Sequence, residues 1–193
     1  MNEPFVPGPR RKPGQWRSGT LFGEYDFIQF IALDAAGRAR EKIARQWIKR
    51  MAIAIRKHDR RTLITVGMLP WSRQWHYLSG FDPAKTARKL DFISVHIYPD
   101  SRQPGEAMEG LRQFAVGKPV VIEETFPLAC DTIQLESFLR ASRQFACGWL
   151  GHYDGDSPTE LDELDRAGKL TLAQSVYRAW LRLFVTLTPE FAR

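Results

Sequence analysis

The sequence lacks the features that would mark a disulfide-bonded or membrane-embedded protein. It has only two cysteines among 193 residues. Without a repeated cysteine pattern, isolated thiols at Cys130 and Cys147 are favoured over a disulfide. Every apolar run is short and is interrupted by Arg, Asp or Gly, whereas a membrane helix needs about 20 mostly apolar residues. No membrane association is therefore expected.

The chain also lacks a recognisable targeting segment. Met1 to Pro4 are followed by a stretch rich in Pro and Arg, which does not have the basic-then-apolar order of a secretory signal. The sequence therefore gives no support for export and leaves the localisation open.

Three kinds of catalytic motif are missing as well. No glycine-rich loop joins a strand pattern to a helix pattern, which counts against nucleotide binding. No Gly-x-Ser-x-Gly elbow follows any apolar run, which counts against a serine hydrolase. The histidines are not paired at metal-ligand spacing with cysteines or carboxylates, so neither a metal nor a cofactor is predicted. The four histidines are His58, His76, His96 and His152.

What the sequence does contain is enough apolar material for one domain. Hydrophobic residues make up 44% of the chain, which is sufficient for a buried core and counts against disorder. The formal net charge of +6 suggests nucleic acid as a partner, but Arg and Lys are scattered along the chain rather than concentrated in one tract. Solvated helix surface is the favoured interpretation, and no nucleic-acid partner is expected.

Four short apolar runs are predicted to form buried parallel strands, because their apolar residues are nearly continuous and rich in β-branched side chains. Helix-like patterns lie between and after these runs. Strands and helices that alternate in this way are typical of β/α units, arranged as a barrel or as a doubly wound sheet. The four runs are Thr62 to Met68, Asp91 to Tyr98, Pro119 to Glu124 and Phe145 to His152.

The helices are predicted from apolar spacing and from capping residues. Apolar residues recur every four positions before His58, which indicates a helix ending there. Asp82, followed by Pro83, and Asp131 are candidate caps for two further helices, the first running to about Leu90. The first stripe is Ile43, Trp47, Met51 and Ile55, and a last long helix is marked by Leu172, Val176, Trp180, Leu183 and Leu187.

Chemistry is expected at the ends of the strands, because the reacting groups of β/α barrels lie where the strands terminate. One predicted strand ends with His96 and Tyr98, another ends with Glu124, and Glu3 stands near the start of the chain. Cleavage of a glycosidic bond needs one protonated carboxyl group and one ionised carboxylate. Glu3 and Glu124 are the natural pair for this chemistry.

These motifs resemble those of clan A glycoside hydrolases, most nearly the cellulase family, glycoside hydrolase family 5. In that family the fourth strand ends in Asn-Glu, often followed by Pro, which Asn2 to Pro4 match. The sixth strand carries His-x-Tyr, matched by His96 to Tyr98, and the seventh ends in a segment similar to Lys118 to Glu124. Each motif is weak alone, but their order along the chain is specific.

The resemblance implies a role for each matched residue. Glu3 would be the acid/base, Glu124 the nucleophile, and Asn2 a ligand of the sugar 2-hydroxyl. Tyr98 would donate a hydrogen bond to the nucleophile, and His96 would contact the sugar or orient the acid/base. Trp149 would lie beneath the sugar, where its ring could stack on the C–H face of a pyranose.

Several of these positions have other interpretations. Neighbouring residues of a strand point to opposite faces, so only one of Glu123 and Glu124 is expected to face the site. The resemblance selects Glu124, and Glu123 would be a hydrogen-bonded or salt-bridged neighbour; a register off by one would exchange their roles. His96 alone could be a core histidine, but Tyr98 two positions later shares its face, which favours a joint role. For Trp149, packing in the core is about as favoured as sugar binding. Three tryptophans are expected on loops, where they could form sugar subsites or simply pack the loops against the barrel. They are Trp16, Trp71 and Trp75.

The resemblance also implies that part of the family's fold is missing. A complete (β/α)8 barrel takes about 250 residues, and Met1 stands where the body of its fourth strand would be. We expect an α/β fold forming the C-terminal portion of a TIM barrel, about strands four to eight, with the N-terminal β/α units absent. Residues 1–193 would then be one partial catalytic domain.

The expected function is retaining hydrolysis of β-linked polysaccharides or oligosaccharides. The alternative is an inactive truncated remnant or a carbohydrate-binding pseudoenzyme, which the missing portion favours. The identity of the sugar, the choice between endo and exo action, and the oligomeric state are not indicated by the sequence.

Overall fold

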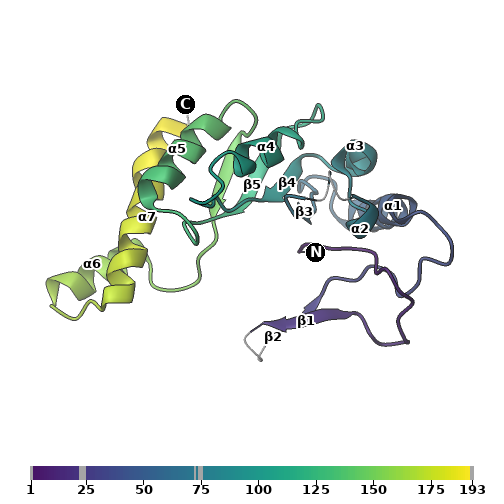
Figure 1. Ribbon diagram of the computed structural model, residues 1–193, viewed down its shortest axis with the longest axis horizontal. Coiled ribbons are helices and arrows are strands. Elements are labelled where there is room, and N and C mark those ends of the chain that lie inside the picture. Colours follow the sequence, from purple (N-terminus) through teal and green to yellow (C-terminus); the bar gives the residue numbers. More distant parts are fainter. Residues whose placement is uncertain (1, 22–24, 72, 74–75, 192–193) are drawn as a thin grey trace.

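The computed structural model describes residues 2–21, 25–71, 73 and 76–191 and has a mixed α/β fold. Its centre is a four-stranded parallel sheet in the order β3-β4-β5-β6 (Figure 1). The strands are β3 (Gly67–Met68), β4 (Ile93–His96), β5 (Val120–Thr125) and β6 (Gly148–Gly151). Because sheet order follows chain order, each parallel connection joins neighbouring strands, as the alternation of apolar runs predicts.

Helices connect the strands and follow the last of them (Figure 1). Helices α4 and α5 lie along one side of the sheet, α1 to α3 gather near β3, and α6 extends beyond α7. The helices are α1 (Arg40–His58), α2 (His76–Ser79), α3 (Pro83–Thr86), α4 (Glu106–Arg112), α5 (Thr132–Ser142), α6 (Pro158–Arg166) and α7 (Leu172–Phe191), with a 3-10 turn, η1, at Ala87–Lys89.

The predicted helix caps are confirmed. The carboxylate of Asp82 accepts a hydrogen bond from the amide of Ala84 at the start of α3. Asp131 and Gln134 form a reciprocal capping box at the start of α5. These caps provide hydrogen-bond partners for amides that the first helical turn leaves without them. Ser157 caps the shorter α6 in the same way, which the sequence interpretation missed.

The core lies between the sheet and the helices. Alternate strand residues Ile93, Val95, Val120 and Ile122 are at most 1% exposed and pack against apolar side chains of the helices. Burying a side chain of this size stabilises a fold by roughly 1.5–3 kcal/mol. The intervening residues of β4, Ser94 and His96, are just as buried although polar. One face of β4 thus makes core and the other makes a polar centre.

The buried face of α1 differs from the predicted stripe. Met51 and Ile55 are 44% and 37% exposed, whereas Ile48 and Ala52 are buried. An α-helix has about 3.6 residues per turn, so a row taken every four residues turns about 40° per step around the axis. The row therefore leaves the buried face after Trp47, which still packs against the core, and Met51 and Ile55 lie on the exposed side.

The other differences concern strands. The predicted strand Thr62 to Met68 is regular only over its last two residues, Gly67 and Met68. An antiparallel hairpin of β1 (Arg17–Leu21) and β2 (Tyr25–Ile28) was not predicted, and it lies apart from the parallel sheet (Figure 1).

The structure also bears on the two cysteines and on membrane-spanning helices. Cys130 and Cys147 are free thiols. Within the described residues, no helix combines the length and the apolar character needed to cross a membrane.

Candidate active site

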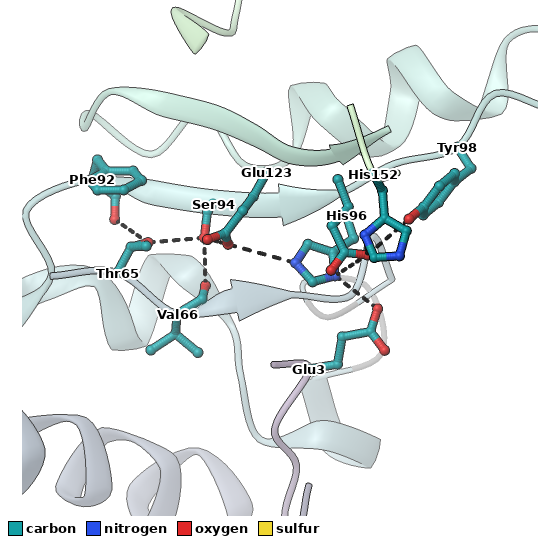
Figure 2. Close-up of polar contacts among 10 residues, drawn as sticks. Glu3, Thr65, Val66, Phe92, Ser94, His96, Tyr98, Glu123 and His152 are labelled. Carbon is teal, nitrogen blue, oxygen red and sulfur yellow. Dashed lines mark hydrogen bonds and ion pairs between the residues drawn. The ribbon is translucent and has the colours of Figure 1, made fainter. Parts of the chain in front are cut away.

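The amino-terminal segment runs beside β3 (Figure 1), and Glu3 on this segment points towards His96 (Figure 2). Asn2 makes a parallel bridge with Gly67, and the amide of Glu3 donates to the Gly67 carbonyl at 3.0 Å. Glu3 has φ of 43°, a left-handed conformation that is unfavourable for a residue with a Cβ atom. Strain of this kind persists where surrounding contacts hold it, and it is frequent at functional sites.

His96 lies at the end of β4 and is the centre of the polar cluster (Figure 2). Its side chain is 2% exposed. Its Nδ1 atom is 3.0 Å from Glu3 Oε1 and 3.4 Å from Glu124 Oε2. Two residues that are remote in sequence therefore meet through one imidazole ring.

Glu124 lies on β5 and is held from its other side by Tyr98. The Tyr98 hydroxyl donates to Glu124 Oε2 at 2.9 Å. Burial and the neighbouring Glu124 carboxylate raise the pKa of Tyr98, so its hydroxyl stays protonated and remains a donor. His152, which follows β6, places Nδ1 3.7 Å from the same oxygen.

Glu123 and Glu124 both reach His96, which corrects the expectation that they point to opposite faces. The register between β4 and β5 shifts between Val95 and His96, so Glu124, not Glu123, is paired with His96. A shift of this kind inserts one extra residue into a strand and breaks the alternation of its side chains. Glu123 Oε2 is 3.7 Å from Nε2 of His96, on the opposite edge of the ring from Glu124.

Glu123 is part of a short polar chain that continues into the sheet (Figure 2). The Ser94 hydroxyl donates to Glu123 Oε2 at 2.6 Å, and the Thr65 hydroxyl lies 3.1 Å from that of Ser94. Contacts with His96 and Ser94 lower the pKa of Glu123, although burial acts to raise it. Glu123 is therefore ionised at neutral pH.

The three carboxylates make His96 a cation. Burial alone would lower the pKa of His96, but Glu123 and Glu3 at its two nitrogens, with the nearby charge of Glu124, raise it to about 9. An ordinary histidine is mostly neutral at pH 7, so this ring differs from the usual one in its charge state.

Gly67 gives the imidazole its space, a role that the sequence did not indicate. A Cβ atom on Gly67 would lie 2.6 Å from Nε2 of His96 and 3.1 Å from Oε2 of Glu123. Because the same residue binds the backbone of Glu3, it joins the amino-terminal segment to the buried cluster. Ser94 was also missed, although its position two residues before His96 puts it on the same face of the strand.

Trp149 is the predicted site residue that the structure does not bring to the cluster. Its indole nitrogen donates to the Ser142 hydroxyl at 2.7 Å, and its ring contacts Phe191 with centroids 4.7 Å apart. Both partners lie on helices, at Ser142 on α5 and Phe191 on α7. Trp149 therefore packs between β6 and these helices. Asn2 is exposed beside Glu3.

A cavity of about 240 Å³ adjoins the cluster across Tyr98. Trp71 lies on its rim, and α4 provides Glu106 and Glu109. Of the other loop tryptophans, Trp16 is 41% exposed, and Trp75 lies outside the described residues.

The distance between Glu3 and Glu124 decides what the pair can do. An oxygen of each, and the nitrogen of His96 between them, lie within 4.8 Å of one another. Two ionised carboxylates at this separation repel by about 3 kcal/mol at an effective dielectric constant near 20. A cation between them offsets that repulsion, and a proton on one carboxyl group removes it. Two carboxyl groups this close can act on the same bond.

The same three residues have the spacing of a possible cation site. A metal ion would need the lone pair of the Nδ1 atom of His96. Carboxylates face both ring nitrogens, an arrangement that favours the doubly protonated ring, which has no free lone pair. The geometry fits an ion-paired histidine better than a metal ligand.

No family model, curated protein or solved structure matches this chain.

Proposed function

We propose that the chain is the catalytic portion of a retaining glycoside hydrolase that acts on β-linked polysaccharides or oligosaccharides. The observation that carries the proposal is the separation of Glu3 and Glu124, because an oxygen of each lies within 4.8 Å of the other. Retaining glycosidases hold their two carboxyl groups about 5–5.5 Å apart, whereas inverting ones leave about 6.5–9.5 Å for a water molecule.

In this mechanism Glu3 gives its proton to the leaving glycosidic oxygen while Glu124 attacks the anomeric carbon. The bond from the anomeric carbon to the leaving oxygen breaks as the bond to the Glu124 oxygen forms. Glu3 then takes a proton from water, which displaces Glu124 and releases the sugar with its original anomeric configuration. Tyr98, donating to Glu124 at 2.9 Å, keeps the nucleophile ionised and oriented.

The proposal includes a fold assignment. Strands β3 to β6 would be the fifth to eighth strands of a (β/α)8 barrel, and Asn2 would mark the end of the fourth. The parallel bridge from Asn2 to Gly67, the first residue of β3, supports this order. So does the meeting of Glu3, His96 and Glu124 at strand ends, where barrel enzymes have their reacting groups.

The cavity beside Tyr98 offers room next to the site for part of a substrate. Its volume of about 240 Å³ is below the roughly 300–1,000 Å³ of small-molecule sites, so it would hold only part of an oligosaccharide. Trp71 at its rim offers an aromatic face for a pyranose ring.

The proposal is tested by hydrolysis of 4-nitrophenyl β-glycosides and of β-linked glucan and mannan by the 193-residue chain. Proton NMR of the first product should show the β-anomer, since retention is expected. Azide added to Glu124→Ala should yield an α-glycosyl azide, whereas azide added to Glu3→Ala should yield the β-azide. An inverted first product would refute the mechanism.

A carbohydrate-binding protein without hydrolytic activity is the second candidate. It is favoured by the packing of Trp149 on α5 and α7, since the resemblance places this aromatic under the reacting sugar. Binding of β-linked oligosaccharides without any release of sugar from the aryl glycosides would favour this candidate.

A further inference from the structure

We propose that Glu123 is a positioning residue that acts through His96. In this proposal Glu123 holds the imidazole ring as a cation and aims its Nδ1–H at the pair formed by Glu3 and Glu124. The inference rests on the proposed glycosidase function for its catalytic consequence and on contacts within the protein for the charge of the ring.

The protonation of His96 follows from what its two nitrogens face. Nδ1 lies 3.0 Å from Glu3 and 3.4 Å from Glu124, and Nε2 lies 3.7 Å from Glu123. Neutral imidazole has one N–H and one bare nitrogen, so one carboxylate would then face a lone pair. Only the doubly protonated ring presents a hydrogen to both sides. A buried cation of this kind needs a partner at each end.

Glu123 is suited to be that partner because it is itself fixed. Its Oε2 atom accepts a hydrogen bond from the Ser94 hydroxyl at 2.6 Å, and the Thr65 hydroxyl lies 3.1 Å from that of Ser94. Glu123 lies on the polar face by the ordinary alternation of β5, since it follows the buried Ile122, and the register shift brings Glu124 to the same face. Gly67 leaves the space in which Glu123 and the ring approach each other. The Ser94 hydroxyl and the place of Glu123 in β5 thus set the position of its carboxylate, although the side chain is 39% exposed.

The charge matters for the two catalytic carboxyl groups. The ionisable groups that face the His96 ring are Glu3, Glu124 and Glu123, and Tyr98 and His152 reach the same Glu124 oxygen. A charged ring offsets the repulsion between the carboxyl groups of Glu3 and Glu124, which have oxygens within 4.8 Å of each other. Without the charge that repulsion is no longer offset, and the geometry of the pair is disturbed.

The first measurement is the nitrogen-15 NMR spectrum of the histidine side chains at about pH 7.5 in wild type and Glu123→Gln, with His96→Asn used for assignment. A free histidine is mostly neutral at this pH. His96 should give imidazolium shifts in the wild-type protein and should become predominantly neutral in Glu123→Gln. Ser94→Ala, which keeps the charge of Glu123 but removes its anchor, should give a smaller change in the same direction.

Kinetics then test the positioning role. Glu123→Gln should lower kcat on 4-nitrophenyl β-glycosides about tenfold or more and leave KM within about threefold, since outer partners of a catalytic group typically contribute tenfold to a hundredfold. Glu163→Gln, an exposed carboxylate on α6, removes the same charge elsewhere and should change neither the His96 spectrum nor kcat. Circular dichroism monitors the folding of each variant.

A neutral His96 in the wild type, or an unchanged imidazolium in a folded Glu123→Gln, overturns the proposal. So does a wild-type kcat in Glu123→Gln. If the wild-type chain hydrolyses none of the glycosides, the glycosidase proposal fails by itself, and the charge assignment is still decided by the spectra.

Discussion

Glu124 and Glu3 reach the same histidine from two very different kinds of backbone. Glu124 belongs to β5, a six-residue strand paired with β4 on one side and β6 on the other. Glu3 belongs to a segment that meets the sheet through a single bridge, with φ of 43°. The sheet fixes Glu124, whereas side-chain contacts with His96 at 3.0 Å and Gln29 at 3.4 Å fix Glu3.

In the proposed mechanism, this difference has a chemical counterpart. A nucleophile must be aimed at one carbon atom, and a strand in mid-sheet is a rigid support for it. An acid/base must serve two successive steps, and its contacts can adjust between them. Substitutions that disturb His96 or Gly67 should therefore affect Glu3 more than Glu124.

The largest expected effect separates the two carboxyl groups by role. Glu124→Gln should lower kcat by at least about 10⁴-fold on every substrate, because no covalent intermediate can form. Glu3→Gln should lower it by about 10²–10⁴-fold on glycosides with poor leaving groups. The loss should be far smaller for a 2,4-dinitrophenyl glycoside, whose departure needs no proton. A leaving-group series of aryl glycosides measures this, and equal losses for both variants would contradict the assignment.

Gly67→Ala is expected to have the next largest effect. The added Cβ would stand 2.6 Å from His96 Nε2, so the ring must move away from Glu123 or from Glu3. Displacement of a catalytic group by about 1 Å commonly costs about 10²-fold in rate. The matched control is Gly105→Ala, where an added Cβ meets nothing within 4 Å. Steady-state kinetics of both variants distinguish a local clash from a general effect of replacing glycine.

The charge of His96 should also appear in the pH dependence of stability. Its pKa rises from 6.5 to about 9 on folding, so its stabilising contribution is complete below pH 6.5 and is lost as the pH rises through about 9. The loss should be on the order of 3 kcal/mol at most. Urea unfolding at pH 6.5 and pH 9.5 should show it in the wild type and in His58→Asn, but not in His96→Asn. An equal loss in His96→Asn would show that other groups cause it.

The smallest effects concern the tryptophans and test where the sugar binds. Trp71→Ala should raise KM for β-linked oligosaccharides about threefold to tenfold and leave aryl monoglycosides nearly unchanged. Trp149→Phe should lower the free energy of unfolding by about 1 kcal/mol through the lost hydrogen bond to Ser142, without changing KM. A raised KM in Trp149→Phe would instead show that this residue contacts the sugar.

The sequence predicted the features that depend on neighbours along the chain. The four strand positions follow from continuous apolar runs, and the caps Asp82 and Asp131 follow from hydrogen bonds within one turn. The proximity of Glu3, His96 and Glu124 agrees with the expectation drawn from the resemblance, although the enzymatic role assigned to them is still a prediction.

Features that depend on pairing between strands could not be predicted. The register shift that turns Glu124 towards His96, beside Glu123, leaves no mark in the local sequence of β5. The need for glycine at position 67 arises only once β4 lies beside it. The sequence did not indicate whether Trp149 points to the site or to the helices, and its contacts with α5 and α7 place it against the helices.

The central claim is that Glu124 forms a covalent bond to the sugar, and mechanism-based trapping tests it most directly. The chain is incubated with 2,4-dinitrophenyl 2-deoxy-2-fluoro-β-glucoside and, separately, with the corresponding mannoside, followed by peptide mapping with mass spectrometry. We expect one fluoro-sugar per chain on Glu124 and none in Glu124→Gln. A label on Glu123 or Glu3, or no label on a chain that hydrolyses the parent glycoside, would contradict the account.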